Sequence, residues 1–590
     1  MKKILWIAQL KTQLLALALC CTALINAQAT LQWAYSFGSN DFYETDQAFD
    51  VETDEEGNVY MTGYYVDSVD FDPGPGEAFY YFSDVKKAGV LAKYSPDAEL
   101  LWVVPVGDYY GQAAGYEINF DNEGNVLWTG WVLGSVDFDP GPATHLAGGS
   151  LTATSIFLAK YDSHGNYIFA LAVDGNYPSS GKQIITDDDN NILIIGNFQS
   201  TIDFDPSGAE FSLTSENFYG DLFFAKYSSS GDFIFAKSIS ATPTSDNFDH
   251  GDYVAEDAAG NIFITGMFSG SCDFDPDAGV TELTGIAADI FFAKYDADMN
   301  LIWVKQIAGN DQKETHAIAL DNDENIYIAG WYRGDMDMDA SGNEYTLEHS
   351  TDLSDDIFFA KYTNAGEIVW AKTIGGYGYD YARSIAVDDE GLIYISGDFY
   401  SSVDFDPGSG VHLLEDTINH GDGFIALYDN NGNYLNASQI EGSMWNETYI
   451  MNMHLNNAGD IYITGYFSQS ADFDCTNGDN ILTSGGDYDF FLAKYDSIIS
   501  LPVDILQLNT MQLNAYPNPA SDLITINLPD DFKGNKIELF NSYGKLIYSA
   551  IVNAQHTFSI PLEDYYEGMY LLQMSGNDII YYSKFLIAHN

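Results

Sequence analysis

One stretch of the chain, residues 54–74, returns six more times and limits the fold more than any other feature of the sequence. Its marker is a glycine that ends an apolar run, and this glycine recurs about every 67 residues, a period typical of repeat architectures. An aspartate follows each marker glycine by seven residues. The marker glycines are Gly63, Gly130, Gly196, Gly266, Gly330, Gly397 and Gly465, and the aspartates are Asp70, Asp137, Asp203, Asp273, Asp337, Asp404 and Asp472. The sequence therefore predicts one structural unit in seven copies.

Each copy contains four short, largely apolar segments, as expected for strands of a sheet that is covered on both faces. The first segment ends in an Asp-x-x-Gly-Asn turn, such as residues 54–58, whose fourth position suits a positive φ. The second runs to the marker glycine, the third resembles residues 289–295 (DIFFAKY), and the fourth resembles residues 301–305 (LIWVK). Four-stranded units of this kind are typical of propeller blades that pack against one another.

The first and last copies complement each other. An aromatic residue lies eight positions after the tyrosine of the third segment in copies one to five (Trp102, Phe169, Phe235, Trp303 and Trp370), whereas copy six has Asn436 and copy seven has no equivalent. Residues 31–35 (LQWAY) resemble an isolated fourth segment. We therefore predict an all-β fold, a seven-bladed β-propeller over residues 30–496 that the strand around Trp33 closes, which removes exposed edges. An open solenoid is the alternative.

The repeats resemble the SBBP-type seven-bladed propeller repeats of exported bacterial proteins. The resemblance rests on the patterns DxxGNxYxTG and FFAKY and spans about residues 31–496. It implies the fold and leaves the activity open.

The beginning of the chain has the layout of a secretory signal peptide. Lys2 and Lys3 precede an apolar run over residues 14–25, and Ala27-Gln28-Ala29 follows, so we expect residues 1–29 to be a leader cleaved before Gln28 or Thr30. The run is too short to span a bilayer comfortably, and no second long apolar stretch follows. We therefore expect export and no transmembrane span.

After a linker predicted at residues 497–512, alternating apolar residues indicate a small β-sandwich over 513–590. Residues 515–520 (AYPNPA), 543–545 (YGK) and 568–572 (GMYLL) resemble the type A C-terminal sorting domain of the type IX secretion system. This resemblance implies the type IX machinery as a partner, transport across the outer membrane, and an extracellular or cell-surface location.

The chain is strongly acidic: 87 Asp and Glu stand against 22 Lys and Arg, a net charge of −65. Such a surface repels nucleic acid and anionic membranes, so neither is expected as a partner. The two cysteines beyond the leader, Cys272 and Cys475, lie in copies four and seven, so we expect free, buried thiols.

Two recurring polar patterns admit structural and functional interpretations. The Asp-x-Asp pair that begins at Asp70 could hold Ca²⁺ with backbone carbonyls, or could cap the backbone N–H groups of a turn. A lysine precedes the tyrosine of the third segment in six copies, and copy six has Leu427 there. We expect each ammonium to meet an aspartate while its stem covers apolar surface.

Chemistry is best sought where the repeats differ. The residue fourteen positions before each marker glycine is, in order, Phe49, Tyr116, Lys182, Asp252, His316, Arg383 and Met451. We place this position on the innermost strand, so Lys182, Asp252, His316 and Arg383 are candidate binding residues that line the central channel. Charges that merely neutralise each other in a wet channel are the alternative.

These features favour an exported, non-catalytic binding or adhesion propeller that holds a glycan or a protein at its top face and channel. Two other functions stay open: a secreted propeller enzyme that acts on polysaccharide, and a structural surface protein bridged by divalent cations. We find no nucleophile elbow, phosphate-binding glycine loop or CxxC pair, and we assign no catalytic residue, metal ligand or cofactor apart from the Ca²⁺ alternative.

Overall fold

The computed structural model describes residues 29–39, 45–81, 87–108, 111–215, 220–241, 250–341, 343–349, 354–416, 420–443, 447–476, 478–496, 510–512, 514–517, 520–527, 536–540, 546–551, 557–562, 565, 568–576 and 579–587. The expected signal peptide and most of the expected linker lie outside these ranges. All regular elements within them are β-strands, which confirms the all-β prediction. The described residues therefore contain no helix that could cross a membrane. Residues 29–496 form one compact unit, and residues 497–590 belong to a second.

In the first unit, consecutive strands pair into antiparallel sets of four, one for each sequence repeat. From the first strand of each set to its fourth, the sets are β2 (Gln47–Thr53), β3 (Val59–Tyr65), β6 (Ala88–Tyr94), β7 (Leu100–Val106); β8 (Gln112–Phe120), β9 (Val126–Leu133), β12 (Ser155–Tyr161), β13 (Tyr167–Val173); β14 (Ser180–Thr186), β15 (Ile192–Phe198), β18 (Asp221–Tyr227), β19 (Phe233–Ala241); β20 (His250–Glu256), β21 (Ile262–Asp273), β22 (Glu282–Tyr295), β23 (Leu301–Gly309); β24 (Lys313–Leu320), β25 (Ile326–Tyr332), β28 (Asp356–Tyr362), β29 (Ile368–Gly376); β30 (Tyr381–Val387), β31 (Ile393–Phe399), β34 (Asp422–Tyr428), β35 (Tyr434–Gly442); and β36 (Thr448–Leu455), β37 (Ile461–Asp472), β38 (Ile481–Tyr495), β1 (Leu31–Phe37).

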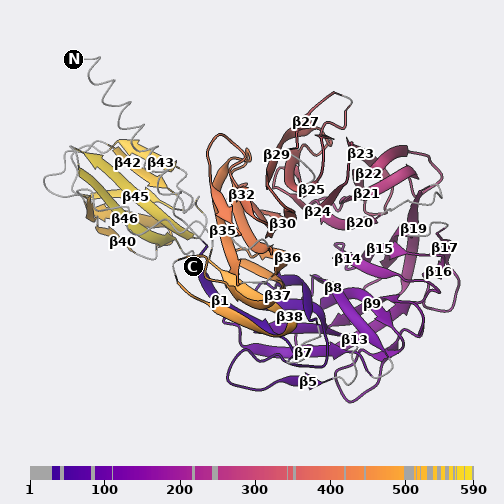
Figure 1. Ribbon diagram of the computed structural model, residues 1–590. Coiled ribbons are helices and arrows are strands. Elements are labelled where there is room, and N and C mark those ends of the chain that lie inside the picture. Colours follow the sequence, from indigo (N-terminus) through magenta and orange to yellow (C-terminus); the bar gives the residue numbers. More distant parts are fainter. Residues whose placement is uncertain are drawn as a thin grey trace. The chain divides into compact units, whose positions relative to one another are not determined.

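The N-terminal strand takes the place of a missing fourth strand, as the sequence predicts. β1 pairs with β38, so the indigo start of the unit lies beside its orange end in Figure 1. The Trp33 Nε1 donates a hydrogen bond to the Pro96 carbonyl in the first set, at 3.1 Å. Trp102 and Trp370 make the equivalent bond to the set that follows theirs. The first strands also contact one another in order, and β2 contacts β36.

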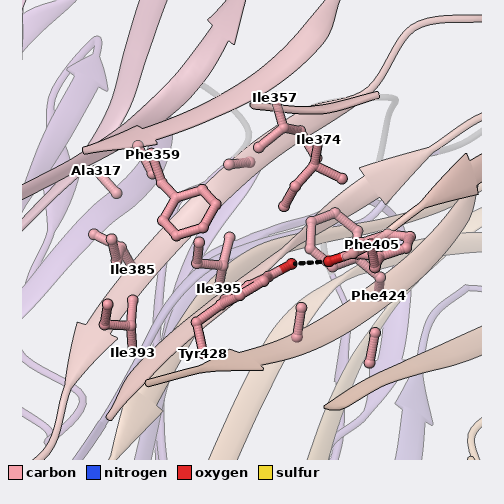
Figure 2. Close-up of a cluster of buried hydrophobic side chains, with 14 of the residues drawn as sticks. Ala317, Ile357, Phe359, Ile374, Ile385, Ile393, Ile395, Phe405, Phe424 and Tyr428 are labelled. Atoms are coloured by element: carbon pink, nitrogen blue, oxygen red, sulfur yellow. Dashed lines mark hydrogen bonds between the residues drawn. The ribbon is translucent and has the colours of Figure 1, made fainter. Parts of the chain in front are cut away.

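The Asp-Phe-Asp motif and the third-strand tyrosine form one buried connection. Figure 2 shows the core in which the Tyr428 hydroxyl donates a hydrogen bond to the Phe405 carbonyl, at 3.1 Å. The same bond joins Tyr94 to Phe71 and Tyr495 to Phe473 in the first and last sets. Phenylalanine therefore fills the core while its backbone satisfies the buried tyrosine hydroxyl.

The first aspartate of this motif holds a turn. Asp70 Oδ1 accepts hydrogen bonds from the Asp72 and Ala78 amides, and the equivalent aspartate does the same in every set. The segment between the second and third strands of a set forms a short hairpin, such as β4 (Ser68–Asp70) with β5 (Phe79–Tyr81). The capping interpretation of this aspartate is confirmed.

Each marker glycine faces a bulge in the first strand of its set. Gly130 pairs with Gly115, and the register shifts at the next residue, Tyr116. A Cβ on Gly130 would lie 2.0 Å from the Ala114 carbonyl oxygen, and five other marker glycines have equivalent approaches of 1.9–2.1 Å. Glycine recurs here because the bulged strand leaves no room for a side chain.

The third-strand lysines join neighbouring sets. All six form ion pairs with a turn aspartate of their own set at 2.7–3.0 Å, as predicted. Five of them also donate to the following set; Lys160, for example, reaches the Ser229 carbonyl at 3.1 Å. Although burial opposes ionisation, bonds from Asn125 and Lys160 hold the pKa of Asp121 below its usual value. In the set with Leu427, burial instead raises the pKa of the turn residue Asp388.

The second unit contains two sheets that share a core around Ile526, Leu539 and Leu572. One sheet has the order β39 (Thr510–Gln512), β46 (Ile579–Ile587), β45 (Gly568–Gly576), β42 (Lys536–Phe540), β43 (Leu546–Ile551), and the other has β40 (Asn514–Tyr516), β41 (Leu523–Asn527), β44 (Thr557–Pro561). Because β39 pairs with β46, residues 510–512 belong to this unit and not to the linker predicted to end at 512. The pairing was missed because a three-residue strand carries too short a pattern to recognise.

Candidate functional site

The residues singled out where the repeats differ all lie at the bulges of the first strands. Phe49, Tyr116, Lys182, Asp252, His316, Arg383 and Met451 each occupy the position at which the register shifts. A bulge re-aims a side chain, so this column can differ between sets without disturbing the ladders. The side chain of Asp252 lies outside what the structure describes, so its predicted role stays a prediction.

Two of the candidate residues, His316 and Arg383, lie on neighbouring first strands and are held by local partners. Arg383 Nε donates to Asp398 Oδ1 at 2.8 Å, and His316 Nδ1 donates to the Ala382 carbonyl at 3.0 Å. Burial raises the pKa of Asp398 although Arg383 opposes this, while Asp398 keeps the pKa of Arg383 above its usual value against the effect of burial. These charges are therefore largely neutralised within the fold.

The third candidate, Lys182, lies in the third set beside a different group, an arc of aromatic rings on the first two sets. Its ammonium is 4.2 Å from the centre of the Tyr116 ring. Tyr116 contacts Phe49 edge-on, with ring centres 5.0 Å apart, and Phe49 packs on Tyr64 at 5.9 Å. Lys87 caps the other end, 3.8 Å above the Tyr64 ring. We call these five residues, with Trp131 beside them in the same cluster, the aromatic arc.

A cavity of ≈ 280 Å³ borders the aromatic arc between the second and third sets. Tyr116 and Trp131 form one part of its lining, and the hydroxyl and amide side chains of Ser180, Asn197 and Gln199 form another. A concavity with aromatic faces and a few polar groups is the usual form of a small-molecule subsite.

Sequence reasoning missed the residues that directly follow the marker glycines. This column contains Tyr64, Trp131, Asn197, Met267, Trp331, Asp398 and Tyr466. It pairs with the start of the first strand, so it lies beside the bulges. In the last set, Tyr466 packs against Tyr449 with tilted rings whose centres are 5.0 Å apart. The variation in this column was visible in the sequence and could have identified the arc.

A second polar group joins the first strands of four sets, β2, β8, β14 and β36. Asp50 Oδ2 accepts from the Ile118 amide at 2.8 Å, and Asp50 Oδ1 is buried without a hydrogen-bond partner among the described residues. Glu117 accepts from Gln183 at 3.1 Å, and His454 pairs with Glu52 at 2.9 Å. Burial, with Glu52 nearby, raises the pKa of Asp50 to about 8, and burial with Asp50 raises that of Glu117.

This group makes stability depend on pH. Since the folded pKa of Asp50 is raised from 3.8, its contribution to stability is complete below pH 3.8 and is lost as pH rises through about 8. We expect Asp50→Asn to be stabilised relative to the wild type as pH increases, most steeply between pH 4 and 8. Melting temperatures of both proteins from pH 4 to 9 check this. A difference between them that does not change with pH would contradict it.

The Asp-x-Asp pairs use one oxygen of each carboxylate to hold their own turn. The second aspartate, such as Asp72, also accepts a backbone N–H, here from Gly74 at 2.7 Å. Among the described residues, no cluster of three Asp, Glu, His or Cys side chains has the spacing of a metal site. Cys272 and Cys475 are buried thiols that form no disulfide with any described residue, as expected, and burial raises the pKa of Cys475 to about 12.

Two family models match the chain. Residues 514–588 match the Secretion system C-terminal sorting domain, and residues 302–331 match the Beta-propeller repeat. The second match covers the fourth strand of one set and the first two strands of the next, which is the segment that contains His316 and its bulge.

Similarity to individual proteins is more distant. The chain is 24% identical over 560 residues to the Uncharacterized WD repeat-containing protein L264 of Acanthamoeba polyphaga mimivirus, covering 81% of this chain and 39% of that protein. It is 31% identical over 90 residues to Ulvan lyase NLR42 of Nonlabens ulvanivorans, covering 15% and 16%. The chain thus spans well under half the length of either relative. A solved member of the duf4221 family from Bacteroides vulgatus covers 62% of this chain and 92% of its own at 10% identity, with a TM-score of 0.28, too low to inform on the fold.

Proposed function

Because the chain carries a Beta-propeller repeat and a Secretion system C-terminal sorting domain, we propose that it is an exported, non-catalytic binding propeller delivered to the cell surface by type IX secretion. The sorting domain implies export and an extracellular or cell-surface location. The ligand and the way it binds are the parts that we infer from the arrangement of the repeats.

We take the sets of four strands as seven blades closed into a ring. The pairing of β1 with β38 and the contact of β2 with β36 support closure, because they join the last set to the first. The Trp33 bond to Pro96 repeats the bond that Trp102 makes to Ser163 between ordinary neighbours. In a ring, the bulges of the first strands gather around one central channel.

Closure makes a mutational prediction. Trp33→Ala should destabilise the protein by about 2 kcal/mol, less than a fully buried tryptophan would, and by as much as Trp102→Ala and Trp370→Ala. We expect equal losses of stability because each of the three indoles donates one hydrogen bond to an adjacent blade. Chemical denaturation of the three variants measures it. A Trp33→Ala protein as stable as the wild type would mean that the ring is not closed by this strand.

We propose that this propeller binds a glycan, and the aromatic arc with its adjoining cavity carries this proposal. Half-buried aromatic faces stack on the apolar faces of sugar rings, while Ser180, Asn197 and Gln199 can exchange hydrogen bonds with hydroxyl groups. Arg383 and Asp398 neutralise each other, which suits a binding surface better than an acid–base pair.

A glycan array probed with the protein, followed by a hydrolase panel with and without EDTA, tests the proposal. We expect binding that survives EDTA, no turnover, and at least about tenfold weaker binding in Trp131→Ala, since stacked rings dominate such contacts. Tyr81→Ala, at a tyrosine that is 66% exposed on the β5 hairpin, is the control and should bind normally. Binding unaffected by Trp131→Ala would place the site elsewhere, and a protein ligand would give no signal on any glycan.

One observation favours a polysaccharide-degrading enzyme as a second candidate. Asp50 and Glu117 are carboxyl groups of raised pKa that interact electrostatically in adjacent first strands, and enzymes use such pairs. Turnover of any panel substrate that Glu117→Gln abolishes would establish this function instead. Activity or assembly lost specifically in EDTA would favour the third candidate, cation bridging.

A further inference from the structure

The aromatic arc ends in two lysines that the fold does not neutralise. The ammonium of Lys87 lies over Tyr64 and that of Lys182 over Tyr116, and neither forms an ion pair with any residue that the structure describes. By contrast, the six third-strand lysines all lie within 3.0 Å of a carboxylate oxygen. In a chain with 87 acidic residues, two unpaired cations at one site are notable because carboxylates are abundant.

Both lysines are partly covered. Their stems are half-buried, as are Phe49, Tyr116 and Trp131. The rings connect them without a break, from Tyr64 on β3 through Phe49 on β2 to Tyr116 on β8, and Lys182 lies on the next first strand, β14. An ammonium held over a ring face keeps its positive charge while losing part of its hydration, so it interacts strongly with an anion that enters the site.

The cavity supplies the remaining contacts. It shares Tyr116 and Trp131 with the arc, so a group stacked on Tyr116 lies within reach of both the Lys182 ammonium and the polar side chains of the cavity. The combination of a stacking face, hydrogen-bonding side chains and a cation matches a sugar ring that carries an acidic substituent. A neutral glycan would leave the two ammonium groups without a partner.

We propose that the ligand of the aromatic arc is an acidic polysaccharide whose carboxylate or sulfate groups bind Lys87 and Lys182. This inference rests on the proposed glycan-binding function and specifies its ligand class. The sugar rings lie on Tyr116 and Trp131, and negative groups spaced along the polymer meet the lysine at each end of the arc. The net charge of −65 repels polyanions at long range, so only a local site of this kind would hold one.

Calorimetric titration of the full-length protein tests the ligand class. The probes are polygalacturonate with its fully methyl-esterified form, and dextran sulfate with unmodified dextran, so that each acidic polymer has a neutral match. We expect an acidic polymer to bind and its neutral match to bind at least about tenfold more weakly, which is the effect of losing one charge-assisted hydrogen bond. Whether polygalacturonate or dextran sulfate binds distinguishes carboxylate from sulfate recognition.

Variants locate the effect. Lys182→Met and Lys87→Met keep the apolar stem and remove the charge, so each should weaken the acidic polymer by about tenfold and leave the neutral one unchanged. Lys372→Met, at a β29 lysine without an ion pair among the described residues, is the control of equal charge and should bind like the wild type. Circular dichroism verifies that each variant is folded.

The outcomes separate this inference from the function beneath it. Acidic and neutral polymers that bind equally, or acidic binding that survives both lysine substitutions, would overturn the acidic ligand while leaving glycan binding in place. A folded protein that binds none of the four polymers and no glycan on an array would overturn the proposed function itself.

Discussion

Replacing Gly130 by alanine is expected to destabilise the protein by about 3 kcal/mol or more, the upper end of the cost of overpacking. The added Cβ would lie 2.0 Å from the Ala114 carbonyl oxygen, and its next neighbours, at 3.0 Å, are also backbone atoms. Backbone cannot rotate away as a side chain can, so the bulge at Tyr116 must shift. The midpoint of chemical denaturation should fall accordingly.

Two further glycines separate this clash from other effects of the substitution. Gly124 has a φ of 75°, and a Cβ added there would meet no other atom within 4 Å. Gly124→Ala should therefore cost only about 1 kcal/mol of backbone strain. A Cβ added at Gly149 would lie 3.4 Å from Asp174 Oδ2, which is an ordinary van der Waals contact. Gly149→Ala should therefore change stability by less than about 0.5 kcal/mol. If Gly130→Ala and Gly149→Ala have the same denaturation midpoint, the close approach of the bulge is not the reason that glycine recurs at the marker position.

The recurring motifs made much of the fold predictable. The position of the strands, the turn at Asp54–Asn58 with Gly57 at a φ of 79°, and the lysine–aspartate pairs all follow from residues close in sequence or fixed in register. The sequence predicts a fourth strand around Trp33 because copy seven lacks a fourth segment and residues 31–35 resemble one, and β1 does pair with β38. Such inferences need only the repeat itself.

The candidate site was only partly predictable because it depends on contacts between different copies. Sequence comparison identified the column of Tyr116, Lys182 and Arg383, but not that Lys182 would pack on Tyr116 whereas Arg383 would pair with Asp398. The buried group of Asp50 and Glu117 comes from first strands about 67 residues apart, with no motif to join them. Their neighbours were decided by how adjacent sets pack, which no single repeat encodes.

Removing the Lys160 ammonium is the second substitution with a large expected effect. In Lys160→Leu the aspartate partner, whose side chain is 1% exposed, would lose a bond of 2.7 Å and remain buried. Breaking a buried ion pair from one side costs about 3–5 kcal/mol, because the remaining charge is uncompensated. The Ser229 carbonyl of the following set would lose its donor as well, so the interface between the two sets should loosen.

The loss of stability in Lys160→Leu should depend on pH, and the sixth set, which has Leu427 in place of the lysine, indicates the direction. The lowered pKa of Asp121 stabilises the wild type above pH 3.8, and this contribution is lost as pH falls through the folded pKa. In Lys160→Leu the pKa should instead be raised, as it is for Asp388 beside Leu427, so the variant loses stability as pH rises. The gap between the two denaturation midpoints should therefore be wide at pH 7 and narrow at pH 3.

Two comparisons make this result specific. Adding Asp121→Asn to Lys160→Leu should recover part of the loss at pH 7, because the amide keeps an oxygen for the Asn125 backbone N–H and carries no charge. Lys372→Leu removes a lysine that has no ion pair among the described residues and should behave like the wild type at both pH values. A gap that is the same at pH 3 and pH 7 would show that Lys160 acts through packing of its stem alone, and the interface between sets would then owe nothing to its charge.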